Sequence, residues 1–296
     1  MRPHRRGRPR IAVSGRADLH SHTVASDGSL APAALVALAA ESGVAALAVT
    51  DHDSLAGVPE ALEAGRALGV RVVPGVELSV KVPSGSMHLL GYFREAAPQP
   101  LAGRLEEMRG AREDRARRIV ARLAEAGAPV SFDDVAARAA GAIGRPHVAE
   151  ALVAAGHARD RQDAFDRYLA NGGPGDVPHG GLGPREAIAL VRESGGAAVL
   201  AHPASLGMAA RELGAFVQRL TSWGLAGIEV HRPEHTPERR REFAELAHRN
   251  RIVACGGSDF HRPDEALRPG DTGDPPLPPD VIDRLLPAPA ERHPVP

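Results

Sequence analysis

The sequence is poor in cysteine, in aromatic residues and in net charge. Cys255 is the only cysteine, so no disulfide can form within the chain, which fits a reducing compartment. Aromatic residues make up 3% of the sequence, too few for the stacking surfaces that bind single-stranded nucleic acid. The formal net charge of −1 gives no overall field that would hold the chain on nucleic acid or an anionic membrane.

Long apolar runs are missing as well. No run approaches the roughly 18 residues of a membrane span, and the basic residues at 1–10 have no apolar segment behind them, as a secretory signal would. We therefore expect a cytoplasmic protein without membrane contact. Its 296 residues, of which 43% are hydrophobic, are enough for one large domain or for a domain with an insertion.

Strand and helix patterns alternate along most of the chain. Short apolar runs predict strands at 45–49, 70–76, 88–93, 197–201, 227–230 and 252–255. Helical spacing lies between them, for example at 32–42, where Pro32 and Gly43 mark the boundaries. Strands that alternate with helices indicate an α/β fold with a parallel sheet.

Residues 104–180 interrupt this alternation. They contain several helical patterns and no convincing strand, so we interpret them as an all-helical insertion. The predicted parts are a basic flexible arm at 1–16, the first part of the α/β domain at 17–103, the helical insertion at 104–180, the second part of the α/β domain at 181–270 and a proline-rich tail at 271–296.

Histidines and acidic residues gather where the predicted strands stop. These segments read DLHSH at 18–22, TDH at 50–52, GVE at 75–77, H at 88, AHP at 201–203 and SDFH at 258–261. Alternate side chains of a strand share a face, so His20 and His22 can bind one ion together. Because the carboxyl ends of parallel strands converge at the mouth of a barrel, we expect one metal centre there. Imidazole and carboxylate are ligands of zinc, manganese and iron.

In their order, these motifs resemble those of the PHP (polymerase and histidinol phosphatase) family. The matching segments read DLHSHT, SDG, TDHD, GVE, HLLGY, AHP and GSDFH. The resemblance implies a distorted (β/α)7 barrel with the helical insertion as a cap, and a cofactor of two or three divalent metal ions, Mn, Fe or Zn. The insertion, with Gly-Arg-Pro-His at 144–147, is similar to the branch that contains nucleoside 3′,5′-bisphosphate phosphatases and 5′→3′ exoribonucleases of short RNAs.

The resemblance also implies nine metal ligands. They fall into three sets, namely His20, His22, Glu77 and Asp259 for one metal, Glu77 again with His88 and His202 for a second, and Asp27, His52 and His261 for a third. All nine positions hold the residue type that the family's motifs require. Asp51, beside His52, is expected to orient ligands rather than to bind metal.

Such a centre is suited to phosphoester hydrolysis. A metal ion lowers the pKa of bound water from 15.7 to about 7, and two ions can stabilise the attacking and the leaving oxygen of a displacement at phosphorus. We therefore predict a hydrolase that uses a metal-activated hydroxide on a nucleotide, such as a nucleoside 3′,5′-bisphosphate, or on a short oligoribonucleotide. The alternatives are a small phosphomonoesterase of the histidinol phosphatase kind and a noncatalytic metal-binding PHP module. No stable protein partner is predicted.

Several further residues are candidates for catalysis or substrate contact. Arg145 is either a capping or surface charge or, as the resemblance favours, a clamp that neutralises phosphate charge beside His147. Arg112 lies on an arginine stripe that either pairs with nearby acidic residues on a solvated helix face or holds a second phosphate. The remaining candidates are Lys81, His179 in a possible lid and, as a catalytic residue at a strand end, His231.

Overall fold

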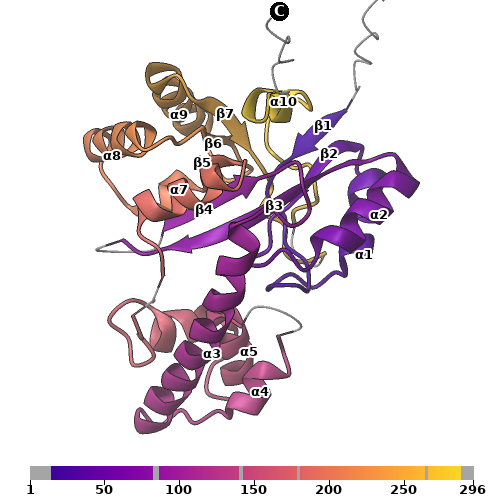
Figure 1. The fold of residues 1–296 in the computed structure, drawn as a ribbon. Helices are drawn as coiled ribbons and strands as arrows, with labels where there is room; N and C mark the ends of the chain where they lie inside the picture. The colour runs from indigo at the N-terminus through magenta and orange to yellow at the C-terminus, as the bar shows by residue number, and fades with distance from the viewer. Residues whose placement is uncertain (1–14, 83–86, 140–142, 179–180, 264–265, 288–296) are drawn as a thin grey trace, which may run out of the picture.

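The structure is a computed structural model that describes residues 15–82, 87–139, 143–178, 181–263 and 266–287. Within these residues the strands form one seven-stranded sheet in the order of the chain. The strands are β1 (Arg16–Asp18), β2 (Val44–Val49), β3 (Arg71–Val80), β4 (Met87–Tyr92), β5 (Ala197–Leu200), β6 (Gly227–His231) and β7 (Val253–Gly256). Four of the six neighbouring pairs are parallel and are connected through helices (Figure 1), which confirms the predicted α/β class.

Strand β4 runs in a direction that the sequence does not predict. It is antiparallel to both β3 and β5, so the expectation of a parallel sheet is wrong at this strand. Only six residues separate Val80 from Met87, and a parallel connection needs a dozen or more. His88 therefore lies at the amino end of its strand. That end pairs with the last residues of β3, at the edge where the parallel strands finish.

Strand β3 is longer than predicted. Glu77 does not end the strand but lies inside it, because pairing continues to Val80. The first half of β3 pairs with β2 and the second half pairs with β4, while Glu77 also forms an isolated bridge with His52. This change of partner places Glu77 between the loop that follows β2 and strand β4.

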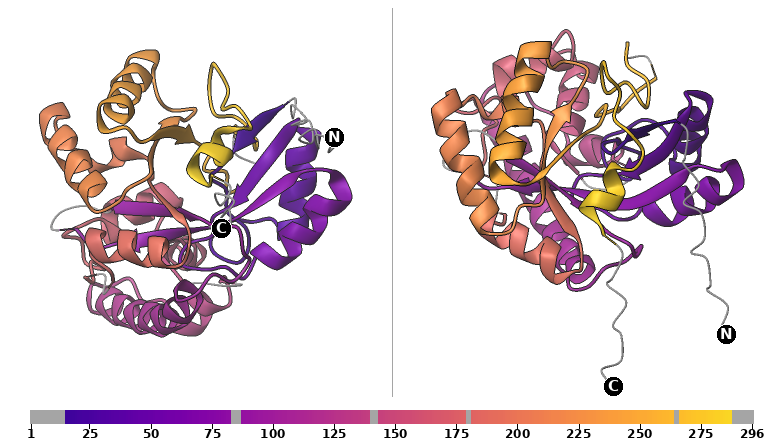
Figure 2. Two further views of the ribbon diagram at one scale, coloured as in Figure 1. Left: turned by 45° about the horizontal axis from the view of Figure 1, so that its top comes forward. Right: turned by 90° about the horizontal axis from the view of Figure 1, so that it is seen from above.

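Helices cover the outer side of the sheet (Figure 2). They are α1 (Pro32–Glu41), α2 (Val58–Leu68), α7 (Pro184–Glu193), α8 (Ala210–Ser222) and α9 (Pro237–Asn250). The short α10 (Val281–Leu285) packs instead against the opposite, inner face of the sheet. Apolar side chains from both edge strands share one buried cluster with α10, including Ala17 of β1 and Cys255 of β7. Cys255 is fully buried there.

The two edges of the sheet lie side by side beyond β1 and β7. The amide of Leu19 donates to the carbonyl of Gly256 at 3.2 Å, and the amide of Asp259 donates to the carbonyl of His20 at 2.9 Å. A Cβ atom at Gly257 would lie 2.3 Å from the Cβ of His20, so only glycine allows this approach. The first and the last sequence motifs are therefore neighbours in space.

Residues 101–178, which we call the helical region, contain no strand among the residues that the structure describes. The elements are α3 (Leu101–Glu125), α4 (Phe132–Ala136), α5 (Arg145–Ala154), α6 (Arg161–Ala164) and the π-helical turn η1 (Phe165–Leu169). Leu101 and Leu105 of α3 pack into the main core, whereas Ile119 and Leu123 pack into a separate core of the helical region. No helix in the described part of the chain is long and apolar enough to cross a membrane.

Candidate metal centre

The nine candidate ligands come from loops and strands around the whole sheet, and the structure gathers them at one edge. Three sets have ligand atoms within 4.8 Å of one another, and their members are His20, His22, Glu77 and Asp259; His22, Asp27, His52 and His261; and His52, Glu77 and His88. We call the first set the Glu77 group and the second set the Asp27 group. His202 completes the nine, with its Nε2 2.9 Å from Oε1 of Glu77.

Glu77 lies at the centre of the cluster and is 1% exposed. Five imidazole nitrogens lie 2.8–3.2 Å from its oxygens, those of His20, His22 and His52 at Oε2 and those of His88 and His202 at Oε1. Burial opposes ionisation of this carboxyl, but the surrounding histidines hold its pKa well below its usual range. An ionised carboxylate with both oxygens surrounded in this way can bridge two cations.

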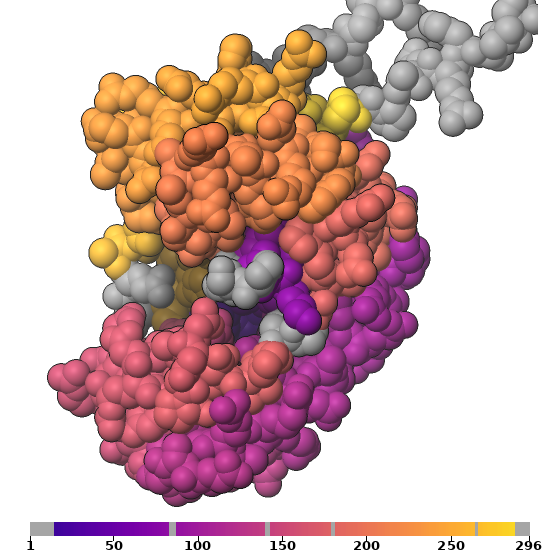
Figure 3. Space-filling view, turned by 90° about the vertical axis from the view of Figure 1, so that its left-hand side faces the viewer, coloured from indigo at the N-terminus to yellow at the C-terminus, as the bar shows by residue number. Residues whose placement is uncertain are grey.

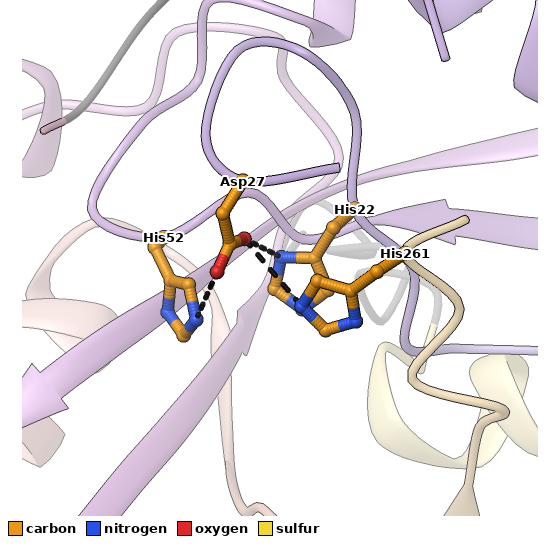
Figure 4. Close-up of side chains that lie close together, drawn as sticks. All are labelled: His22, Asp27, His52 and His261. Carbon is orange, nitrogen blue, oxygen red and sulfur yellow. Dashed lines mark ion pairs between the residues drawn. The ribbon is translucent and has the colours of Figure 1, made fainter. Parts of the chain in front are cut away.

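Asp27 is the carboxylate of the Asp27 group. In Figure 4 it points between His52 on one side and His22 and His261 on the other. Its Oδ1 is 3.5 Å from His22 Nδ1 and 3.5 Å from His261 Nε2, and its Oδ2 is 3.8 Å from His52 Nε2. Four ligands at about 2.1 Å around a tetrahedral ion are themselves roughly 3.4 Å apart. The spacing of these atoms therefore suits a cation.

Glu229 and Arg232 hold members of the Glu77 group in place. Oε1 of the fully buried Glu229 accepts a hydrogen bond from His20 Nδ1 at 3.1 Å, and its Oε2 accepts one from the amide of His202 at 2.6 Å. Arg232 donates to Glu229 at 2.9 Å and to Asp259 at 3.1 Å. Because His20 donates through Nδ1, its Nε2 faces the cluster, as in metal-binding histidines generally.

Neither Glu229 nor Arg232 is predicted from the sequence as part of the site. Glu229 did leave a signal, since an acidic residue inside an apolar strand is rarely buried without a partner. Arg232 follows the strand and left no comparable signal, because only folding brings it to Asp259. The carboxylate of Asp51 accepts hydrogen bonds from Thr23 and Ser26, and Oγ of Ser26 lies 3.4 Å from Nδ1 of His22, so an orienting role for Asp51 stays a prediction.

Several buried polar atoms of the cluster have no hydrogen-bond partner among the described residues. They are His20 Nε2, His22 Nε2, His52 Nδ1 and Asp27 Oδ1. Leaving such an atom unpaired costs about 1–3 kcal/mol, and bound cations would satisfy all four. The mixed imidazole and carboxylate set suits Mn, Fe or Zn. The residues therefore fit the ions that the resemblance implies.

The electrostatics of the cluster also favour bound cations. Burial opposes protonation of His22, but its partners Asp259 and Glu77 prevail and raise its pKa to about 10. Burial lowers the pKa of His52 to about 4, although Glu77 and Asp27 oppose this, so its imidazole is neutral and able to bind metal. The negative charge that draws a proton to His22 would equally stabilise a metal ion.

Backbone strain is concentrated at the same place. His202, Asp259 and Asp53 have positive φ angles of 24°, 57° and 47°. Each such conformation costs on the order of 1–3 kcal/mol in a residue other than glycine and persists only where neighbouring contacts enforce it. Here the contact of the His202 amide with Glu229 supplies one of these constraints. Strain of this kind is typical of functional sites.

A cavity of about 640 Å³ opens beside the cluster. Asp27, His52 and His88 form part of its wall. The cationic residues of the wall are Lys81, Arg112, Arg115 and Arg145. Figure 3 shows the surface hollowed between the helical region and the sheet with its helices. An anionic molecule in this cavity would therefore lie between the candidate metal ligands and cationic side chains.

Arg112 lines this cavity, but its guanidinium is already engaged. Nε donates to Asp53 Oδ2 at 2.7 Å, and Nη2 donates to Ser79 Oγ at 2.7 Å. The alternative of pairing on a solvated helix face is wrong for this arginine, because its side chain is 13% exposed and its acidic partner lies outside its helix. Arg145 has more freedom, since its guanidinium makes one hydrogen bond among the described residues, to the carbonyl of Leu169 at 3.2 Å, and otherwise lies over the ring of Phe165.

His147 also borders the cavity, yet both of its ring nitrogens have partners. Nδ1 accepts from the amide of Gly144 at 3.1 Å, so Nε2 carries the proton and donates to the carbonyl of Ser26 at 3.1 Å. The ring therefore bridges two backbone groups, and a contact of His147 with substrate stays a prediction. Lys81 lies on the cavity wall, and His179 lies outside the described residues.

His231 is not brought into the site. The pairing of β6 with β7 shifts register between Glu229 and His231, which is how a β-bulge redirects side chains. Glu229 therefore faces the cluster, while Nδ1 of His231 lies 3.1 Å from the carbonyl of Pro275. The expectation of a catalytic role for His231 was based on its place at a strand end, and the structure corrects it by directing the ring away from the cluster.

Comparison with known proteins agrees with this geometry. Residues 18–129 match the family model described as PHP domain. The chain is 37% identical to the 5′-3′ exoribonuclease Rnm of Salmonella typhimurium, over 83% of this chain and 85% of the relative. The chain belongs to the PHP family. The predicted resemblance and the class of PHP phosphoesterase, a hydrolase, are thereby confirmed.

Two further comparisons concern a nucleotide phosphatase and a solved structure. The 3′,5′-nucleoside bisphosphate phosphatase of Chromobacterium violaceum is 36% identical over 85% of this chain and 89% of its own length. A solved structure from Bifidobacterium adolescentis, assigned as a metal-dependent phosphoesterase, superposes with a TM-score of 0.81 at 31% identity, covering 92% of this chain and 96% of that one. The PHP relatives thus include enzymes named for nucleotides and for RNA.

Proposed function

We propose that this PHP phosphoesterase hydrolyses nucleotide phosphates, either the 3′-phosphate of a nucleoside 3′,5′-bisphosphate or the terminal nucleotides of a short RNA in the 5′→3′ direction. The observation that carries the proposal is the cavity that joins the candidate ligands Asp27, His52 and His88 to the arginines of the helical region. A substrate with two phosphates can then place one at the cluster and the other against the arginines.

The proposed metal ligands are the nine residues already described. His20, His22, Glu77 and Asp259 would hold one ion; Glu77, His88 and His202 a second; Asp27, His52 and His261 a third. Bound ions would supply Lewis acidity and a water of lowered pKa at neutral pH. Their identity among Mn, Fe and Zn stays a prediction, as does a cytoplasmic location.

The chain's own residues would position the substrate. Arg145 is proposed to bind phosphate oxygens in a two-pronged contact, which suits its planar guanidinium. Burial and the neighbouring Arg112 lower the pKa of Arg145, so an anion in the cavity would relieve repulsion between like charges. Lys81 adds a further cation to the wall of the cavity. Arg112 is proposed to act indirectly, by holding Asp53 beside His52.

The finer architecture is part of the same proposal. We propose that the sheet is a distorted (β/α)7 barrel, supported by the backbone hydrogen bonds between residues 19–22 and 256–260. The helical region is proposed to be a cap on this barrel, supported by residues from both that line one cavity.

The test is a substrate panel with the full chain and Mn²⁺. Adenosine 3′,5′-bisphosphate should release inorganic phosphate, and a short 5′-phosphorylated RNA should release mononucleotides from its 5′ end. Turnover of histidinol phosphate in place of both would overturn the substrate assignment. His52→Ala should abolish turnover, and unchanged turnover in this variant would instead indicate a noncatalytic metal-binding module.

A further inference from the structure

Three contacts tie the helical region to the loops that carry the Asp27 group. Each contact falls on a residue that is next in sequence to one member of that group. The contacted residues are Ser26, which precedes Asp27; Asp53, which follows His52; and Arg262, which follows His261.

The first contact is buried, and the second is largely buried. His147 of α5 is 3% exposed and donates from Nε2 to the carbonyl of Ser26 at 3.1 Å. Arg112 of α3 donates to the carboxylate of Asp53, whose pKa is held below its usual value by this arginine despite burial. Asp53 has the strained φ of 47°, so the arginine fixes a conformation that the loop alone would disfavour.

The third contact is partly exposed. Nη2 of Arg262 donates to Glu150 of α5, with 26% and 25% of the two side chains exposed. Glu150 and His147 are three residues apart on one helix, so they lie on the same face of α5. This single face therefore reaches two of the three loops.

The Glu77 group is held in another way. Its described supports come from the sheet and the loops beyond it: Glu229 orients His20, Arg232 binds Asp259, and the amide of Asp259 donates to the carbonyl of His20. None of these residues belongs to the helical region. The two groups share His22. The Arg112–Asp53 contact reaches both groups, since the amide of Asp53 donates to the carbonyl of Glu77 at 2.9 Å. The contacts of His147 and Glu150 fall on the loops of the Asp27 group.

We propose that the helical region positions the Asp27 group, so that the cation affinity of this group depends on these three contacts, while that of the Glu77 group is independent of the contacts of His147 and Glu150. His147, Arg112 and the Glu150–Arg262 pair are then positioning residues for one ion among several. The inference rests on the proposed metal centre, but it does not depend on which substrate is hydrolysed.

The experiment measures Mn²⁺ bound to the metal-free full chain, by equilibrium dialysis and elemental analysis over a range of free Mn²⁺. The variants are Glu150→Gln, Arg262→Gln and Arg112→Gln. The matched control is Arg109→Gln, because Arg109 lies on the same helix as Arg112 but pairs with the exposed Glu106. Circular dichroism checks that each metal-free protein is folded.

We expect one class of site to weaken about 10-fold in each of the three variants, which is the lower end of the effect of losing contacts around metal ligands. In the Glu150→Gln and Arg262→Gln proteins the remaining sites should bind as in the wild type, and the Arg109→Gln protein should match the wild type at every site. The exchanged pair Glu150→Arg with Arg262→Glu should recover much of the lost affinity, which a general loss of stability would not explain.

Three results would overturn the inference. These are unchanged affinity of every site in folded variants, equal weakening of all sites in the Glu150→Gln and Arg262→Gln proteins, and an Arg109→Gln protein that binds Mn²⁺ as weakly as Arg112→Gln. If Arg112→Gln does not fold, the partly exposed Glu150–Arg262 pair still decides the question. A wild-type protein that binds no Mn²⁺ would refute the proposed metal centre and this inference with it, whereas normal binding without turnover would refute only the proposed substrate.

Discussion

Replacing Glu229 by glutamine tests the buried network behind the candidate metal centre. The substitution keeps the shape of the side chain but removes the negative charge that faces Arg232 and His20. Breaking a buried ion pair costs roughly 3–5 kcal/mol. We expect the lower end, about 3 kcal/mol, because Arg232 keeps its contacts with Asp259 and Glu234.

The pKa of Glu229 leads to a similar magnitude. Burial would raise it, but Arg232 and His20 prevail and lower it from 4.5 to about 2, which corresponds to about 3 kcal/mol at neutral pH. At about 2.1 cal/mol/K per residue, 296 residues have an unfolding entropy of about 0.6 kcal/mol/K. A loss of about 3 kcal/mol should therefore lower Tm by about 5 °C.

The assay is calorimetry of the metal-free wild type and variant, followed by Mn²⁺ titration, where we expect 10–100-fold weaker binding because His20 loses its orienting partner. Glu234→Gln is the matched control. Glu234 contacts the same arginine, but its side chain is 51% exposed, so its loss should cost at most about 1 kcal/mol. A Tm of Glu229→Gln within 1 °C of wild type, or equal shifts in the two variants, would refute the reasoning.

Further predictions concern pH, substrate, reactivity and packing. Because the folded pKa of Glu229 is depressed, its contribution to stability is present above pH 4.5 and declines as pH falls toward 2; denaturation between pH 5 and 3 should show the difference between wild type and Glu229→Gln shrinking. Arg145→Ala should raise KM for a bisphosphate substrate about 10–100-fold, the effect of losing one charged hydrogen-bonding group, with Arg145→Lys in between; steady-state kinetics would contradict a phosphate contact if both variants matched wild type. Burial raises the pKa of the Cys255 thiol, so Ellman's reagent should titrate no thiol in the native protein and one after denaturation. Gly257→Ala has no room beside His20, 2.3 Å away, and should destabilise the fold by about 1–3 kcal/mol in urea denaturation; an unchanged midpoint would show that the two edges of the sheet are not tightly packed.

Much of the fold follows from local patterns. The strands at 45–49 and 197–201 and the helix at 32–42 agree with the structure to within one residue at each end, because burial on one or both faces of an element leaves a periodic trace in its own sequence. The candidate ligands could also be predicted from the sequence, because histidines and acidic residues at the ends of apolar runs have few structural reasons to be there.

The sequence did not reveal how these elements face one another. The short β3–β4 connection reverses β4 and brings His88 to the cluster, and a register shift in β6 keeps Glu229 at the site and turns His231 away from it. Both depend on pairing between strands, which single-strand periodicity does not record.

By itself, therefore, the sequence determined the α/β class, the PHP family and the chemical type of the site, because these depend on the identity of residues and on their spacing along the chain. Only the tertiary structure decided which charged groups support it. Arg232 reaches Asp259, and Arg112 reaches Asp53, across 27 and 59 residues of chain. Such partners share no local sequence pattern. Each buried charge needs an opposite charge nearby because folding removes it from water, and only the folded chain brings the two together.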